Sequence, residues 1–141
     1  MRVTSLTQKG EKIVTIFKSI ILVGAVTVAS SAIADATDDL IALDKQWGEA
    51  GGPAGFVSED VMGIGPNGIV GFSDMVAEAE AAGDVDESYV VSGYKVTFLN
   101  DDIAVMVHTA AGSDPHASLH VFQKQGDTWL VVANASAPAG Q

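Results

Sequence analysis

Four consecutive β-strand patterns fill the last third of the chain and restrict the folds that it can adopt. They cover residues 89–99, 103–112, 117–125 and 128–136. Each is rich in the β-branched and aromatic side chains that favour strands. Asn100-Asp101 and Gly126-Asp127 suit two-residue hairpin turns between neighbours. The pattern therefore predicts an antiparallel meander.

The residues before the meander predict two helices separated by a short hairpin. The expected elements are a helix over 38–50, a hairpin of 59–64 with 69–72, and a helix over 74–82. Thr37 and Ser73 are the expected N-caps, since a hydroxyl can accept from the free N–H groups of the first turn. Apolar residues recur at helical spacing in the first helix: Leu40, Leu43, Trp47 and Ala50. We therefore predict an α+β fold, with helices packed on one face of a curved antiparallel sheet.

Side-chain alternation along the strands divides this sheet into two faces once the turns are fixed. The face predicted to lie under the helices is largely aliphatic and includes Val96, Val105, Val121 and Val132. The opposite face carries Met106, His108, His120, Phe122 and Trp129. That face is too rich in large apolar groups to be left in water, so we expect it to form the interface of a homodimer.

Polar side chains on the helix-covered face indicate a pocket. Asn134 is expected to point inward, where a buried amide must find partners, and Tyr94 offers a hydroxyl on the same face. The predicted ligand-binding residues are Trp47, Tyr94, Thr109 and Asn134. An apolar cavity with a few converging polar groups is the usual form of a small-molecule site. A closed core with Asn134 bonded to backbone is the alternative.

The N-terminal segment has the order of a signal peptide. Its basic residues are Arg2, Lys9, Lys12 and Lys18. The apolar run over 20–29 is about half of the roughly 20 residues that a spanning helix needs. Two A-x-A patterns end at Ala34 and Ala36. We predict a signal peptide over 1–36, cleaved near Ala34 or Ala36, and one domain over 37–141 in the bacterial periplasm or outside the cell. An uncleaved N-terminal anchor is the alternative.

The charge of the chain argues against two classes of partner. The net charge is −11, and removal of residues 1–36 leaves Lys45, Lys95 and Lys124 as the basic residues. This acidic protein should repel phosphate backbones and anionic lipid, so we expect no nucleic-acid partner and no membrane partner after signal cleavage.

The three histidines do not predict a metal site. His116 and His120 are separated by about 13 Å along an extended strand, and the sequence shows no cysteine and no evident carboxylate partner. Interface or surface positions are expected for them instead. We therefore expect no metal and no cofactor.

Four segments, in this order, resemble the SnoaL-like branch of the nuclear-transport-factor-2-like (NTF2-like) superfamily, including its small exported members. They are 43–50 (LDKQWGEA), 65–71 (GPNGIVG), 100–105 (NDDIAV) and 121–136 (VFQKQGDTWLVVANAS). The resemblance implies a cone fold over nearly all of residues 37–141. Members of the superfamily include enzymes, binding proteins and assembly domains, so the fold does not define the function.

The resemblance leaves three functions open. No carboxylate lies between Glu49 and Glu59, close to where related ketosteroid isomerases hold their general base. The leading hypothesis is therefore a dimer that binds a small apolar molecule in the cone. One alternative is an isomerase, lyase or hydrolase acting on a small hydrophobic substrate, with Tyr94 as donor and Asp44 or a histidine as base. The other is a purely structural dimerisation domain.

Overall fold

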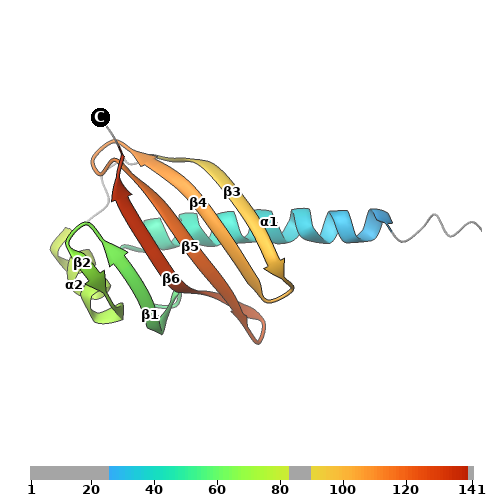
Figure 1. Cartoon of the computed structure of the whole chain (residues 1–141), viewed down its shortest axis with the longest axis horizontal. Coiled ribbons are helices and arrows are strands. Elements are labelled where there is room, and N and C mark those ends of the chain that lie inside the picture. The colour runs from blue at the N-terminus through green and yellow to red at the C-terminus, as the bar shows by residue number, and fades with distance from the viewer. Residues whose placement is uncertain (1–25, 83–89, 140–141) are drawn as a thin grey trace, which may run out of the picture.

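Two helices cover one face of a curved six-stranded sheet in the computed structural model, which describes residues 26–82 and 90–139 (Figure 1). The elements are α1 (Val26–Ala50), β1 (Val57–Gly65), β2 (Gly68–Val70), α2 (Phe72–Ala82), β3 (Val90–Asn100), β4 (Ile103–Ala111), β5 (His116–Gln125) and β6 (Thr128–Pro138). The predicted α+β class and the four-strand meander are confirmed.

The sheet joins the short hairpin to the last strand of the meander. Its strand order is β2-β1-β6-β5-β4-β3, and β1 runs parallel to β6 while the other neighbours are antiparallel. The predicted hairpin between 59–64 and 69–72 is present; Gly65 pairs with Gly68, so Pro66 and Asn67 are its two turn residues. Figure 1 shows α1 crossing behind the sheet and extending beyond its edge, and α2 lying beside β1 and β2.

The β3–β4 turn differs from the prediction by one residue. Asn100 pairs with Ile103 and Phe98 pairs with Ala104, so the turn residues are Asp101-Asp102 and Leu99 is an extra residue. The Asp102 N–H donates to the Asn100 side-chain oxygen at 2.8 Å, which stabilises this turn. A slip of one residue exchanges the two faces of a strand, so β4 presents the opposite side chains from those predicted.

The β5–β6 turn is placed as predicted, but a bulge follows it. Gln123 pairs with Leu130 across the Gly126-Asp127 turn. Phe122 then pairs with Val131 and Val121 with Ala133, which leaves Val132 as the extra residue. The residue opposite His120 is therefore Asn134.

The face prediction for β4 and β5 is wrong. Met106 and Phe122 are 0% and 1% exposed and belong to the core under the helices. The five residues expected on an outward-facing interface lie on the helix-covered face, either buried or packed against the core: Met106, His108, His120, Phe122 and Trp129. Val105 and Val121 alternate with them and lie on the uncovered face. Val96 remains with the core.

Helix α1 begins earlier than predicted. Thr37 donates its hydroxyl to the Ile33 carbonyl at 2.9 Å, which is an internal helical contact and not an N-cap. The predicted cleavage positions, Ala34 and Ala36, lie inside α1. The basic segment and most of the apolar run of the predicted signal peptide lie outside the described residues. Over 26–82 and 90–139, neither helix has the length and apolar character that a membrane crossing demands.

Helix α2 begins at a cap that differs from the predicted Ser73. The Gly71 N–H donates to the Asp74 carboxylate at 2.8 Å, and the Met75 N–H donates to the Gly71 carbonyl at 3.1 Å. Asp74 also places a negative charge in the first turn, where the helix dipole favours it. Gly71 is therefore the N-cap, and Met75 is anchored in the core.

Candidate active site

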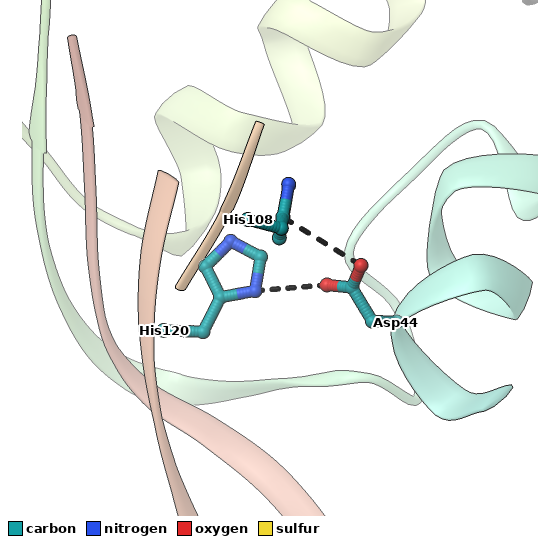
Figure 2. Close-up of side chains that lie close together, drawn as sticks. All are labelled: Asp44, His108 and His120. Atoms are coloured by element: carbon teal, nitrogen blue, oxygen red, sulfur yellow. Dashed lines mark ion pairs between the residues drawn. The ribbon is translucent and has the colours of Figure 1, made fainter. Parts of the chain in front are cut away.

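A carboxylate and two imidazoles meet in the interior between α1 and the sheet. Asp44 projects from α1 toward His108 of β4 and His120 of β5 (Figure 2). The His120 Nδ1 atom lies 2.9 Å from Asp44 Oδ1, and His108 Nε2 lies 3.6 Å from Asp44 Oδ2. The three residues are 6%, 5% and 4% exposed, so a set of ionisable groups is held almost entirely away from water.

Helical and strand periodicity bring these side chains together. Asp44 follows Leu40 by four residues and precedes Trp47 by three, so it lies within the apolar stripe of α1. His108 and His120 are diagonal neighbours on adjacent strands, because Met106 pairs with His120. Their ring centroids are 5.0 Å apart in an edge-on arrangement.

Two aromatic side chains border the carboxylate and the imidazoles. The Tyr94 hydroxyl donates to Asp44 Oδ2 at 3.0 Å, and its ring centroid lies 5.4 Å from that of His108. The Trp47 ring lies 5.0 Å from the His120 ring. We refer to Asp44, Tyr94, His108 and His120 as the Asp44 cluster.

The surroundings favour a charged Asp44 and a neutral His108. Burial raises the pKa of Asp44, but His120, His108 and the Tyr94 hydroxyl together outweigh it, so the net pKa is below the ordinary 3.8. Burial lowers the pKa of His108 below its ordinary 6.5, and the charge of Asp44 opposes this only in part. At neutral pH the cluster therefore pairs a carboxylate with an uncharged imidazole at His108.

Several buried polar atoms in this region have no hydrogen-bond partner among the described residues. They are both ring nitrogens of His108, Nδ1 of His120 and Oδ1 of Asn134. The His120 nitrogen is close to Asp44 but its contact falls outside hydrogen-bond geometry, so we treat the pair as an electrostatic contact. Buried groups of this kind are rare in folded proteins, and a bound water or ion or a catalytic role is the usual explanation for them.

The structure brings together part of the predicted pocket. Tyr94 belongs to the Asp44 cluster, and Trp47 borders it. Asn134 lies opposite His120 in the sheet, and cross-strand partners share a face. Thr109 is exposed on the uncovered face, where it donates to the Ser92 carbonyl at 3.2 Å, so its predicted place in an internal pocket is wrong.

An open hollow of about 610 Å³ lies over the uncovered face of the sheet. Its walls are mostly aliphatic and include Ile64, Val107 and Leu119, together with Thr109 and Lys95. A second hollow, of about 420 Å³, lies near Phe72 and Leu130. Of the Asp44 cluster, His108 alone borders one of these two spaces.

The sequence contained a signal for the site that the predictions used only in part. Asp44 stands in the middle of the apolar stripe of α1, where a carboxylate is costly unless it has partners. The expectation of no metal rested on the lack of a carboxylate near the histidines, and Asp44 supplies one. The three side chains therefore offer both a proton-accepting group and a possible set of metal ligands.

Comparison with known proteins places the fold. No family model matches the chain, and no curated protein matches it. An NTF2-like protein from Cytophaga hutchinsonii superimposes with a TM-score of 0.63 at 15% identity, covering 72% of this chain and 97% of the other. An NTF2-like protein of unknown function from Shewanella baltica gives a TM-score of 0.62 at 10% identity, covering 77% and 97%. A cystatin-like-fold domain of unknown function from Nostoc punctiforme gives 0.55 at 19% identity, covering 75% and 79%.

The chain therefore has the NTF2-like α+β cone fold, as predicted. Identities of this size define the architecture and carry no statement about a reaction or a ligand. The SnoaL-like branch remains a prediction from the sequence segments quoted above.

Proposed function

We propose that this chain is an exported enzyme that transfers a proton on a small hydrophobic molecule bound in the cone, as an isomerase, lyase or hydrolase does. The observation that carries the proposal is the buried Asp44 carboxylate, held 3.0 Å from the Tyr94 hydroxyl and 2.9 Å from the His120 ring. This combination favours the enzyme alternative over a binding protein without chemistry.

The burial of Asp44 supports a chemical role. Removing a carboxylate from water is costly. Well-packed hydrophobic residues of similar volume often stabilise a core as well as a buried ion pair does, or better. Ionisable groups with shifted pKa values that gather in an interior are characteristic of reactive sites, although structural networks also produce them. A polar core network that only supports the fold is the competing explanation.

The geometry gives each group a role in proton transfer. Asp44 is ionised and His108 is neutral, so either can accept a proton from a substrate. The Tyr94 hydroxyl is a donor that can stabilise an oxygen on which negative charge develops. Trp47 and Phe122 flank His120 and give the imidazole an aromatic surrounding.

The test uses 2-naphthol, a planar apolar molecule whose single hydroxyl resembles an enol. In a chelator-treated sample, we expect its binding to move the ring resonances of His108 and His120 in ¹H–¹⁵N NMR spectra. Asp44→Asn should weaken the binding by about tenfold or more, because a hydrogen bond to a charged group contributes about 1.5 to 3 kcal/mol. The control is Asp39→Asn, an exposed carboxylate on the same helix.

Equal affinity of Asp44→Asn and Asp39→Asn for 2-naphthol would count against the Asp44 cluster as the reactive site. If neither 2-naphthol nor a panel of small cyclic ketones bound at all, the proposal would be overturned in favour of the structural dimerisation domain.

The same proposal includes a homodimer formed through the uncovered face of the sheet, with residues different from those first predicted. Val107 and Leu119 are 36% and 39% exposed and, with Ile64, line the aliphatic hollow on that face. A contiguous exposed apolar surface of this kind is typical of an interface. Two copies packed back to back would remove it from water.

Dimerisation is tested by analytical ultracentrifugation of the wild type and of Val107→Asp combined with Leu119→Asp. We expect a dimer for the wild type and a monomer for the variant, because two carboxylates would be buried without partners. The control variant Asp39→Asn should sediment as a dimer, like the wild type. A wild type that sediments as a monomer at every concentration would rule out the interface.

Export is the remaining part of the proposal. It is supported by the basic segment, the apolar run over 20–29 and the two A-x-A patterns. Expression of the full chain in a Gram-negative host, followed by N-terminal sequencing of the periplasmic fraction, should give a protein that begins at Asp35 or Thr37. Retention of the intact chain in the cytoplasm would refute export.

A further inference from the structure

We propose that Asp44, His108 and His120 bind one divalent transition-metal ion, with zinc as the first candidate. The ion would be a cofactor of the site proposed above. Its role in catalysis therefore rests on that proposed function. The metal binding itself is independent of any substrate.

The donor atoms have the spacing that a metal site needs. One ligand atom from each of the three side chains can be chosen so that all lie within 4.8 Å of one another. The two carboxylate–imidazole separations are 2.9 and 3.6 Å. Two ligands that each lie about 2.1 Å from one zinc ion at a tetrahedral angle are about 3.4 Å apart. Small rotations of the rings would therefore bring all three groups to a common centre.

The ligands also come from three separate elements of the fold. Asp44 is on α1, His108 on β4 and His120 on β5, and Figure 2 shows the three side chains converging on one point. All three lie next to core residues, since Leu40 and Met106 are fully buried nearby in sequence and Phe122 packs against His120. Rigid neighbours hold ligands in place before the ion arrives.

The unpartnered histidine atoms are a second, independent observation. Both nitrogens of His108 and Nδ1 of His120 are buried and lack a hydrogen-bond partner within the part of the chain that the structure describes. A neutral imidazole nitrogen offers a lone pair to a metal. Coordination would satisfy one nitrogen on each ring, and the carboxylate would balance half of the charge of the ion.

Tyr94 completes the arrangement from outside the ligand set. Its hydroxyl donates to Asp44 Oδ2 at 3.0 Å. Groups that hydrogen-bond to a ligating carboxylate fix its orientation, and their loss commonly lowers metal affinity by about 10- to 100-fold. Tyr94 is therefore a positioning residue for the proposed site.

The chemistry of the donors selects the metal. Two imidazoles and one carboxylate suit zinc, iron(II) and similar ions, whereas magnesium and calcium prefer oxygen ligands alone. Three protein ligands leave a position for water, as in catalytic zinc sites, and zinc lowers the pKa of a bound water to about 7. In the proposed reaction, that bound hydroxide would accept the proton in place of Asp44 or His108.

The experiment measures zinc binding to the full chain by isothermal titration calorimetry after treatment with a chelator. We expect one zinc ion per chain and no detectable magnesium binding. Asp44→Asn, His108→Gln and His120→Gln should each weaken zinc binding by about 100-fold or more, and Tyr94→Phe by about tenfold. The control is His116→Gln, because His116 lies near the same face but pairs with Asp114.

A second measurement uses the wild type alone, so it remains informative if the ligand variants fail to fold. Cobalt(II) bound to the wild type should give the intense visible absorption of a tetrahedral site, and zinc should displace it. The proposal is overturned if zinc does not bind, if His116→Gln abolishes binding while the three ligand variants retain it, or if cobalt(II) shows only the weak spectrum of a hexa-aqua ion.

Different results would overturn the metal site and the proposed enzyme. Absence of zinc binding would leave the 2-naphthol result in chelator untouched. Zinc binding without any small-molecule ligand would support the metal site and refute the proposed enzyme.

Discussion

Replacing Phe122 with alanine is expected to lower the free energy of unfolding by about 3 to 5 kcal/mol, the usual cost of removing a buried aromatic side chain. Phe122 is 1% exposed and is among the largest fully buried residues in the described part of the chain. It packs in the core below α1, with its ring centroid 6.1 Å from that of His120. The substitution would open a cavity directly beside the Asp44 cluster.

The matched control for this prediction is Gln123→Ala on the same strand. Gln123 is exposed on the opposite face of β5, where substitutions usually change stability by less than about 0.5 kcal/mol. Urea denaturation followed by tryptophan fluorescence measures both variants. Comparable losses for the two would mean that the assignment of faces in β5 is incorrect.

The fold was predictable because its signals are local. Each strand of the meander is defined by its own run of apolar and β-branched residues, and the Gly126-Asp127 turn lies where expected because glycine supplies the positive φ of 64°. The order of helix, hairpin, helix and meander then left few α+β arrangements. The parallel pairing of β1 with β6 has no local signal, since it joins residues about 70 positions apart.

The assignment of side chains to faces was not predictable from the same signals. It depends on a single residue at the β3–β4 turn, where the Asn100 side chain favours Asp101-Asp102 over Asn100-Asp101. Aliphatic content also pointed to the wrong face. Val105 and Val121 are on the uncovered side, while the interior accepts His108 and His120 because Asp44 meets them there.

The site itself required contacts between distant segments. Asp44 and Tyr94 are 50 residues apart and form a hydrogen bond, and neither residue alone identifies the other. A carboxylate within an apolar helical stripe was the local warning. Its partners could be found only after the strands were placed in register.

Asp44→Asn is expected to lower the free energy of unfolding by about 1.5 to 3 kcal/mol near pH 5, since the loss of the charge weakens the Tyr94 hydrogen bond and removes the attraction to the imidazoles, and interactions with a charged group contribute about that much. The amide keeps the shape of the side chain and can still accept from Tyr94, but it loses the charge that faces the two imidazoles. Asp39→Asn, exposed on the same helix, should change stability by less than about 0.5 kcal/mol.

The difference in stability between the wild type and Asp44→Asn should depend on pH and pass through a maximum between 3.8 and 6.5, the ordinary pKa values of the two groups. The pKa of His108 is lowered in the folded protein, so the contribution of the neutral His108 ring to stability is complete above pH 6.5. That contribution falls as the pH drops below 6.5. Without the charge of Asp44 that pKa is lowered further, and the variant loses more stability than the wild type over this range. The pKa of Asp44 is also lowered, so its contribution is complete above 3.8 and is lost as the pH falls through the folded value. Urea denaturation of chelator-treated protein from pH 8 to pH 3 measures the difference, and a constant value across that range would show that Asp44 does not interact with His108.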